Sequence, residues 1–236
     1  EPIFEADFLP ANWGFRPKRG ATAALETIRT MGTQGYCWVV DADIQHYFDS
    51  IDRGKLMDQI AERISDRRVQ KLIRQWLEAG VMEDGTVRET LAGTPQGGVI
   101  SPLLANIYLH ALDRTWAEQD AHLGVLVRYA DDFVVMCRSQ AVAETAHRRI
   151  GEIMDRLGLV LHPEKTRLVD LRWGRESFIF LGCTIRKKRS IQRAPKLHFM
   201  QRWPSPGAMK RLRIRPQALT DARRIGVTDV KAMIMD

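Results

Sequence analysis

Residues 125–136 have the sequence Val-Leu-Val-Arg-Tyr-Ala-Asp-Asp-Phe-Val-Val-Met, and this stretch decides the fold. Its arms on either side of the two consecutive acids are almost entirely apolar. Apolar, valine-rich arms that flank a short polar break are typical of a β-hairpin. The stretch therefore predicts two antiparallel strands joined by a turn from Ala130 to Asp132 that carries two carboxylates. An ordinary solvent-exposed hairpin turn is the simpler alternative for these acids.

A second pair of acids follows another apolar stretch. Residues 36–44, Tyr-Cys-Trp-Val-Val-Asp-Ala-Asp-Ile, are apolar enough to form a buried strand, and Asp41 and Asp43 lie near its end. Carboxylates gathered at the edge of a hydrophobic sheet raise each other's pKa unless a cation neutralises them. A hard dication such as Mg²⁺ suits such oxygen ligands. Asp43, Asp131 and Asp132 are thus the candidate metal ligands.

The pattern around these stretches predicts an α+β fold. Apolar residues at helical spacing predict helices at about 20–31, 53–79 and 140–157, and a long helix that opens at Ser101-Pro102 with Ser101 as its N-cap. A second β-hairpin is predicted at 81–91, short strands near 166–171 and 178–185, and a separate small helical element from about 204 onward. Strands that pair as hairpins between helices favour an antiparallel sheet over a doubly wound parallel one.

Composition excludes several protein classes. The 236 residues are 44% hydrophobic and 28% charged, with no apolar run of 18 residues and no signal-peptide pattern, which argues against a membrane span or a secreted protein. The three cysteines form no Cys-x-x-Cys pair, which argues against a disulfide framework and a zinc ribbon. The sequence is typical of a globular domain in a reducing cytoplasm.

The net charge of +7 is unevenly distributed. Residues 172–236 carry sixteen basic and four acidic side chains, whereas the first 171 residues have an excess of acids. Between Arg186 and Arg215 there are eleven basic residues and no acid, interleaved with Phe199 and Trp203. Such a stretch predicts a polyanionic partner, most simply a nucleic acid, because phosphate contacts gain from counterion release. A solvated basic face or a disordered tail is the alternative.

Several motifs resemble those of one enzyme family. Residues 127–134, Val-Arg-Tyr-Ala-Asp-Asp-Phe-Val, resemble the active-site hairpin of reverse transcriptases. Residues 93–109, Gly-Thr-Pro-Gln-Gly-Gly-Val-Ile-Ser-Pro-Leu-Leu-Ala-Asn-Ile-Tyr-Leu, resemble the form found in group II intron-encoded proteins. Further regions resemble motifs of the family in its own order: a fingers motif at 12–21, the first catalytic strand at 41–52, the fourth palm motif at 161–166 and the primer grip at 180–182.

The resemblance implies a right-hand polymerase palm and a division of the chain. Residues 1–40 correspond to part of the fingers, and 41–203 to the palm, with fingers-palm elements at about 81–100. Residues 204–236 correspond to the start of the thumb, or maturase X domain. Because the chain begins within the family's fingers and ends within its thumb, we expect it to be a piece of a longer protein.

The resemblance also implies the chemistry of the site. Two Mg²⁺ ions, for which Mn²⁺ is a possible substitute, would be bridged by Asp43 and Asp131, with the carbonyl of Ile44 and the carboxylate of Asp132 as further ligands. Asp43 is preferred over Asp41 because the family has a bulky aromatic residue five positions after its catalytic aspartate. Lys165 would protonate or neutralise the leaving pyrophosphate, although a surface charge is an equal alternative.

Other residues are implied to hold the substrates. Phe48 would exclude a ribose 2′-hydroxyl by steric contact, with a purely structural core aromatic as the alternative. Residues implied to bind the nucleotide or template are Phe48, Gln96, Gly97 and Arg16. Residues implied to bind the template-primer duplex are Phe180, Leu181 and Gly182 in the primer grip, and Lys210, Arg211, Arg213 and Arg215 in the thumb.

The implied function is RNA-directed DNA synthesis on an RNA template with a DNA primer and dNTPs. A group II intron-encoded protein would also bind its intron RNA, act as a splicing maturase and take part in retrohoming. The alternatives are an RNA-binding maturase module without polymerase activity, and a retron, diversity-generating or CRISPR-associated reverse transcriptase. The expected location is the cytoplasm of a bacterium, or an organelle, with no membrane partner.

Overall fold

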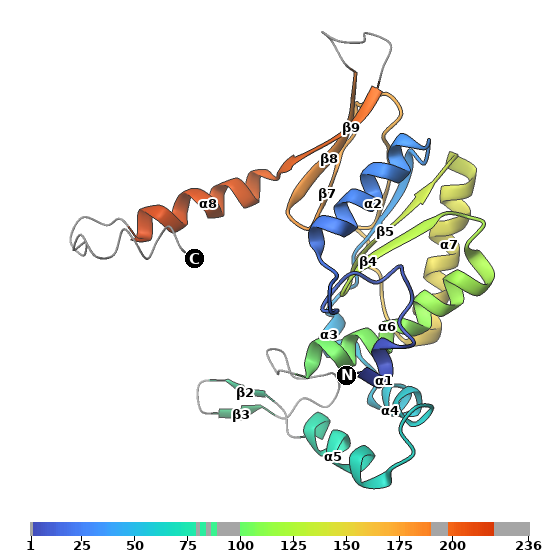
Figure 1. Ribbon diagram of the computed structural model, residues 1–236, viewed down its shortest axis with the longest axis vertical. Helices are drawn as coiled ribbons and strands as arrows, with labels where there is room; N and C mark the ends of the chain where they lie inside the picture. Colours follow the sequence, from blue (N-terminus) through green and yellow to red (C-terminus); the bar gives the residue numbers. More distant parts are fainter. Residues whose placement is uncertain (1, 79–80, 84–85, 89–99, 190–197, 220–236) are drawn as a thin grey trace.

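A four-stranded antiparallel sheet forms the centre of the molecule (Figure 1). The structure is a computed structural model that describes residues 2–78, 81–83, 86–88, 100–189 and 198–219. The strands are β1 (Trp38–Ala42), β4 (Val125–Tyr129), β5 (Asp132–Cys137) and β6 (Arg167–Asp170), and their order across the sheet is β4-β5-β1-β6. Every neighbouring pair is antiparallel. The predicted α+β fold with an antiparallel sheet is confirmed.

The sheet is covered on both faces, so its strands bury residues on both sides. Trp38, Val40 and Ala42 of β1 pack in one hydrophobic cluster with α6 (Ser101–Thr115) and α7 (Gln140–Leu157). Val39 belongs to a second cluster on the opposite face, which is covered by α2 (Ala21–Thr33). This alternation is expected from the two-residue period of a strand. It explains why the strand sequence is apolar on both faces up to Asp41.

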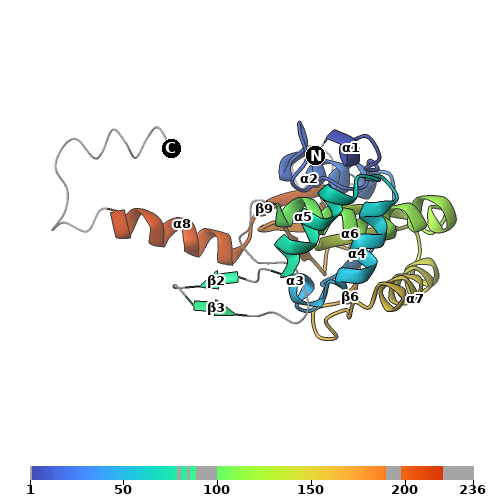
Figure 2. The same cartoon turned by 90° about the horizontal axis from the view of Figure 1, so that it is seen from below.

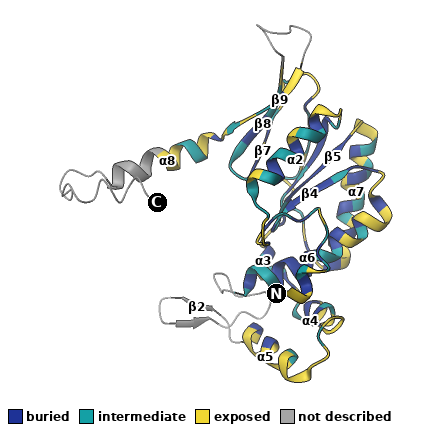
Figure 3. Cartoon of the chain, viewed as in Figure 1, coloured by how far each residue is buried: buried dark blue, intermediate teal, exposed yellow. Residues whose placement is uncertain are grey.

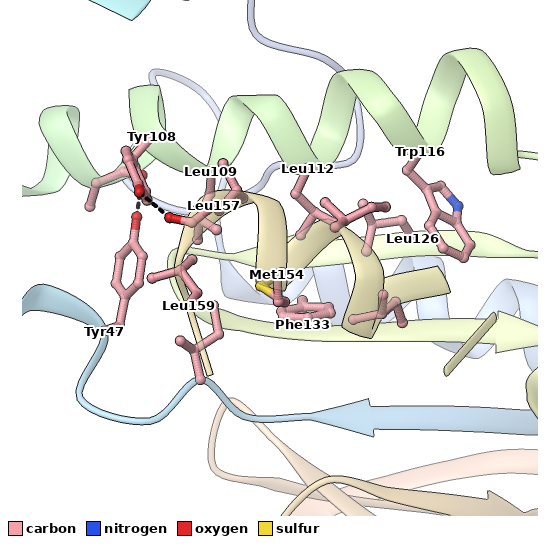
Figure 4. Close-up of a cluster of buried hydrophobic side chains, with 14 of the residues drawn as sticks. Tyr47, Tyr108, Leu109, Leu112, Trp116, Leu126, Phe133, Met154, Leu157 and Leu159 are labelled. Atoms are coloured by element: carbon pink, nitrogen blue, oxygen red, sulfur yellow. Dashed lines mark hydrogen bonds between the residues drawn. The ribbon is translucent and has the colours of Figure 1, made fainter. Parts of the chain in front are cut away.

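The first cluster has two tyrosines at its polar margin (Figure 4). The Tyr47 hydroxyl donates to the carbonyl of Ala105 at 2.7 Å, and the Tyr108 hydroxyl donates to the carbonyl of Leu157. Both side chains are buried, so these bonds satisfy hydroxyls that would otherwise be costly to remove from water. They tie α6 to the chain before and after it.

A second sheet contains β7 (Phe178–Phe180), β8 (Cys183–Arg189) and β9 (His198–Pro204). The sequence predicted one strand near 178–185, which is wrong, because Leu181 and Gly182 turn the chain back on itself. Their φ angles of 49° and 72° are in the left-handed region, so Phe180 pairs with Cys183 across a tight turn. Strand β9 was not predicted, since it lies within the basic stretch. It pairs with β8 along its whole length.

The remaining elements surround these sheets. They are α1 (Pro2–Glu5), α3 (Tyr47–Ser50), α4 (Arg53–Ala61), α5 (Arg67–Glu78), β2 (Val81–Glu83), β3 (Thr86–Arg88), the π-helix η1 (Trp116–Asp120) and α8 (Pro206–Leu219). The predicted helices and the predicted hairpin of β2 and β3 are confirmed. One detail is corrected: Ile100 is the N-cap of α6, Ser101 is its first helical residue and Pro102 its second, so the helix begins one residue earlier than predicted.

Helix α8 extends away from the body of the molecule, as two perpendicular views show (Figures 1 and 2). The central strands and the inward faces of α2, α6 and α7 are buried, whereas the outer faces of α5 and α7 are exposed (Figure 3). Among the residues that the structure describes, no helix is both long and apolar enough to span a bilayer.

Candidate active site at the edge of the central sheet

The strand register brings the predicted acids to one end of the sheet. Ala42, the last residue of β1, lies opposite Phe133 of β5, so Asp43, which directly follows β1, and Asp132, which directly precedes Phe133, lie at the same edge. Residues two apart on a strand share a face, so Asp41, Asp43 and Asp132 point toward the face covered by α2. Three carboxylates from two neighbouring strands therefore share one corner.

Asp131 joins this corner from the hairpin turn. Tyr129 and Asp132 form the last pair of β4 and β5, which leaves a turn of two residues, Ala130 and Asp131. The predicted turn of three residues is thus one residue too long, because Asp132 already belongs to β5. Ala130 has a left-handed φ of 57°, which is unfavourable for a residue with a Cβ. The pairing of β4 with β5 closes this turn, and further contacts can stabilise it.

The pKa values indicate a crowded acidic site. Burial, and then the charges of Asp41, Asp131 and Asp43, raise the pKa of Asp132 to about 6, while a backbone hydrogen bond from Leu181 opposes this rise. Burial, and then the charge of Asp43, raise the pKa of Asp131, against a backbone hydrogen bond and the charge of Arg128. Burial likewise raises the pKa of Asp41 to about 6, against the opposing charge of Arg167. These carboxylates therefore repel one another, as the sequence predicted.

Two basic side chains partly neutralise the corner. Lys165 Nζ lies 2.7 Å from Asp43 Oδ2, and Arg167 Nε lies 3.3 Å from Asp41 Oδ2. The hydrogen bond to Asp43 raises the pKa of Lys165. The segment before Lys165 is anchored to the strand end, since the His162 amide donates to the Asp43 carbonyl at 2.8 Å. The structure thus brings Lys165 to the predicted acids.

The donor set fits a hard divalent cation. Carboxylate oxygens are ligands that Mg²⁺ prefers, and burial together with neighbouring carboxylates raises the pKa of Asp131 and of Asp132, so a bound cation would stabilise their charged forms. In this arrangement, no three acidic, histidine or cysteine side chains of the described residues converge closely enough to hold an ion. The Lys165 ammonium is bound to Asp43 Oδ2, so a cation that used this oxygen would displace it.

Sequence comparison assigns the chain to a family. The model of the reverse transcriptase (RNA-dependent DNA polymerase) family matches residues 3–185. The chain belongs to this family. It is an RNA-directed DNA polymerase family domain, and all the motifs quoted from the sequence lie within the matched residues.

Several relatives of this reverse transcriptase domain are known. Protein YkfC of Escherichia coli strain K12 is 33% identical over 226 residues, which cover 80% of this chain and 58% of YkfC. The group II intron-encoded protein LtrA of Lactococcus lactis is 46% identical over 115 residues, which cover 48% of this chain and 19% of LtrA. The chain therefore spans at most about three fifths of these relatives.

Solved structures support the fold. Apo telomerase from Candida tropicalis, truncated from its C-terminal domain, matches with a TM-score of 0.57 and 13% identity, over 79% of this chain and 40% of that one. At this identity the match concerns the fold alone.

Phe48 of the reverse transcriptase domain lies just after the acidic corner. It is half-buried in α3, packs against the first hydrophobic cluster, and its ring centroid is 5.4 Å from that of Tyr47. Its position fits both the predicted steric role and the structural alternative. Ile44, whose carbonyl is a predicted ligand, is buried and bridges to Leu161.

The predicted primer grip forms the turn between β7 and β8. Phe180 is fully buried in the second hydrophobic cluster, so its side chain anchors the turn rather than facing solvent. The backbone of Leu181 contacts Asp132, and the Gly182 carbonyl accepts from the amide of Ser205 at 2.8 Å. The turn therefore connects the acidic corner to the start of α8.

Helix α8 presents its first basic residues next to this turn. Arg211 Nη2 lies 3.9 Å from the place that a Cβ on Gly182 would occupy. Lys210 and Arg211 are both exposed. The side chains of Arg213 and Arg215, and the whole of Gln96 and Gly97, lie outside the described residues, so their predicted roles stay predictions.

Arg16 is not brought to the acidic corner. Its guanidinium is buried and donates to Glu5, with Nη2 2.7 Å from Oε1, and to the carbonyls of Phe8, Leu9 and Asn12. These bonds hold the segment before α2 together. A contact with nucleotide would require them to break, so the structure gives Arg16 a structural role.

One residue of the site was missed in the sequence. Arg128 is fully buried in β4, directly before the tyrosine that closes the hairpin. The available signal was a single charge within an otherwise apolar strand, because a buried arginine requires specific partners.

Proposed function

We propose that this domain catalyses RNA-directed DNA synthesis, extending a DNA primer on an RNA template with dNTPs. The observation that carries the proposal is the gathering of Asp43, Asp131 and Asp132 at one sheet edge, with raised pKa values at Asp131 and Asp132. A protein that only bound RNA would gain nothing from uncompensated carboxylates beside phosphates. Membership of the family supports the same reaction.

The cofactor in this proposal is a pair of Mg²⁺ ions, with Mn²⁺ as a possible substitute. Asp43 and Asp131 would hold both ions, and the Ile44 carbonyl and the Asp132 carboxylate would be further ligands. Bound there, the ions would lower the pKa of the primer 3′-hydroxyl and neutralise charge on the departing pyrophosphate.

Lys165 has a defined proton role in this scheme. When its bond to Asp43 opens, the ammonium remains within reach of the same corner, because its segment is held by the bond between His162 and Asp43. The protonated amine can then donate to the leaving pyrophosphate oxygen, which gains a proton as the primer hydroxyl loses one. A lysine amine is protonated at neutral pH without any such bond, so the proton is available once the bond to Asp43 has opened.

The other substrate contacts are proposed from where the residues lie relative to the acidic corner and in the family's motifs. Phe48 would contact the sugar of the incoming nucleotide and reject a 2′-hydroxyl, and Gln96 and Gly97 would contact the nascent pair. The turn at Leu181 and Gly182 would hold the primer end beside Asp132. Lys210 and Arg211 of α8, followed by Arg213 and Arg215, would bind the backbone of the template-primer duplex.

We further propose that residues 1–40 are fingers, 41–203 palm and 204–236 the start of the thumb or X domain. The similarity to LtrA supports a group II intron-encoded reverse transcriptase that binds intron RNA as a maturase and acts in retrohoming. The similarity to YkfC, in a bacterium, and the free Cys37, Cys137 and Cys183 support a bacterial cytoplasmic location. An RNA-binding module without polymerase activity is the competing function.

Primer extension by the full chain tests the proposal. We expect Mg²⁺-dependent extension of a DNA primer on RNA, and a loss of at least about 100-fold for Asp131→Asn, because a displaced or missing ligand disturbs the reacting geometry. Asp155→Asn, the same change at an exposed position of α7, should extend like the wild type. Unchanged extension by Asp131→Asn would contradict the assignment of Asp131 to the active site. RNA binding without extension by the wild type would favour the competing function.

A further inference from the structure

Arg128 is a buried charge that the proposed mechanism does not use. Its side chain has no solvent exposure, and its neighbours in β4 are apolar. Removing a guanidinium from water is strongly unfavourable unless its N–H groups find acceptors of suitable geometry. The identity of those acceptors therefore shows what the residue does.

The guanidinium joins α6 to the turn that carries Asp131. Nε donates to Asp113 Oδ1 at 2.8 Å and Nη2 donates to Asp113 Oδ2, which is a bidentate ion pair with α6. Nη1 donates to Asn106 Oδ1 at 3.1 Å and to the Ala130 carbonyl at 2.9 Å. One rigid, planar group thus binds a long helix on one side and the hairpin turn on the other.

The backbone of the same residue binds the segment before α2. The Arg128 amide donates to the Ala11 carbonyl and the Trp13 amide donates to the Arg128 carbonyl, each at 2.8 Å. Asn106 Nδ2 also donates to the Gly14 carbonyl at 2.8 Å. Gly14 lies so close to the turn that a Cβ there would be 2.4 Å from the Ala130 amide nitrogen. The turn is therefore held between Arg128 and Gly14.

We propose that Arg128 is a positioning residue, which holds the Ala130–Asp131 turn and so sets the place of the Asp131 carboxylate. This inference rests on the proposed function. The left-handed φ of Ala130 is the geometry of a two-residue hairpin turn but is unfavourable for a residue with a Cβ, and the bond from Arg128 to the Ala130 carbonyl helps to hold it. Catalytic ligands must be held to within about 0.5 Å, and a displacement of about 1 Å can cost about 100-fold in rate.

The test replaces the buried pair without leaving a lone charge. The double variant Arg128→Met/Asp113→Leu removes both charges and the bond to Ala130, while it keeps most of the side-chain volume. The matched control is Arg149→Met/Asp120→Leu. Arg149 Nε lies 2.9 Å from Asp120 Oδ1, so this pair also links a helix to a neighbouring element, but it does not contact the hairpin turn in the part of the chain that is described.

Two measurements separate positioning from stability. The first is primer extension, in which we expect kcat of Arg128→Met/Asp113→Leu to fall about 100-fold and the control to stay within about 2-fold. The second is the rise in melting temperature with Mg²⁺, which needs no activity. The Mg²⁺ concentration for half of that rise should increase about 10-fold in the double variant and stay within about 2-fold in the control.

Gly14→Ala provides the same test from the opposite side of the turn. The added methyl group would press on the Ala130 amide while the buried pair remains intact, so it should produce the same shift in Mg²⁺ dependence. This variant decides the question if the double variant does not fold. Wild-type kcat and Mg²⁺ dependence in a folded double variant, or in Gly14→Ala, would overturn the inference. A wild-type protein that binds Mg²⁺ but does not extend primers would overturn the proposed function instead.

Discussion

Asp132 shows how a single carboxylate couples the site to stability. Its pKa in the folded protein is about 6, whereas the ordinary value of 3.8 applies when the chain is unfolded. Between these values the folded state binds more protons than the unfolded state, so its stability falls as the pH rises through this window. Above about pH 6 the full destabilisation by Asp132 is present. The charged carboxylate of Asp132 therefore lowers the stability of the metal-free protein.

We expect Asp132→Asn to stabilise the metal-free protein at pH 7.5. Removing the buried, repelled charge should raise the free energy of unfolding by roughly 1–3 kcal/mol, and this gain should shrink as the pH falls from 6 toward 4. Urea unfolding in EDTA across this pH range measures both quantities. Asp155→Asn, at an exposed position of α7, serves as the control and should change stability little at any pH. A gain independent of pH would contradict the assigned pKa.

The sequence predicted a single site residue where an ionisable side chain stood at the end of an apolar strand. Asp43, Asp131 and Asp132 were recognisable because acids at the ends of apolar strands are costly to bury unless a cation or a hydrogen-bond donor meets them. Arg16 and Arg128 were not, since a buried arginine and an exposed one have the same letter. Only the folded structure shows that Arg16 binds three carbonyls, or that Arg128 reaches Ala130. Such roles depend on partners that are distant in the sequence, and these partners cannot be inferred from the neighbouring residues.

Among the helices and strands, hydrophobic periodicity predicted the elements that bury an apolar face. Helices α2 and α7 and strands β1, β4 and β5 have strong apolar patterns, and all were predicted. The split between β7 and β8 was missed because it depends on Leu181, a residue with no turn preference, in a left-handed conformation beside Gly182. Strand β9 was missed because it lies within the basic stretch and only one of its seven residues is buried, namely Met200, which lies against Gly32 of α2.

Helix α8 leads to a prediction about nucleic-acid binding. Lys210 and Arg211 are exposed beside the Gly182 turn, so Lys210→Gln/Arg211→Gln should weaken binding of an RNA-DNA duplex. Each lost phosphate contact should make the slope of log affinity against log salt shallower by about one, hence by about two in the double variant. Fluorescence anisotropy at several salt concentrations measures the slope.

The control for this prediction is Arg148→Gln/Arg156→Gln. It removes the same charge from exposed positions of α7. This helix covers the face of the central sheet opposite to α2 (Figure 1). If both double variants reduce affinity and slope equally, the effect comes from net charge alone, and α8 is not a specific binding element.

At the scale of the whole molecule, the uneven charge follows the architecture. The acidic first part of the chain contains the central sheet and the metal-ligand candidates, whereas the basic last part forms β8, β9 and α8. The two parts meet at the turn of Leu181 and Gly182, which contacts Asp132 on one side and Ser205 on the other. The candidate active site thus lies where the acidic sheet edge and the basic elements join.

This arrangement predicts where the chain can be cut. A chain that ends at Ser205 keeps β9 and the bond from Ser205 to Gly182 but loses α8, which extends away from the body. We expect its melting temperature to stay within about 3 °C of the full chain, since none of the described side chains of α8 belongs to either hydrophobic cluster. It should retain the Mg²⁺-induced rise in melting temperature and lose about 10-fold or more in affinity for an RNA-DNA duplex.

A chain that ends at Arg189 is the matched comparison. It also loses β9, which removes the contact between Met200 and Gly32 and leaves β8 paired with β7 alone. Loss of this burial should lower the melting temperature by roughly 10 °C or more. If the chain ending at Ser205 melts as low as the one ending at Arg189, then α8 belongs to the folded core. The proposed boundary between palm and thumb at residue 204 would then have to move toward the C-terminus.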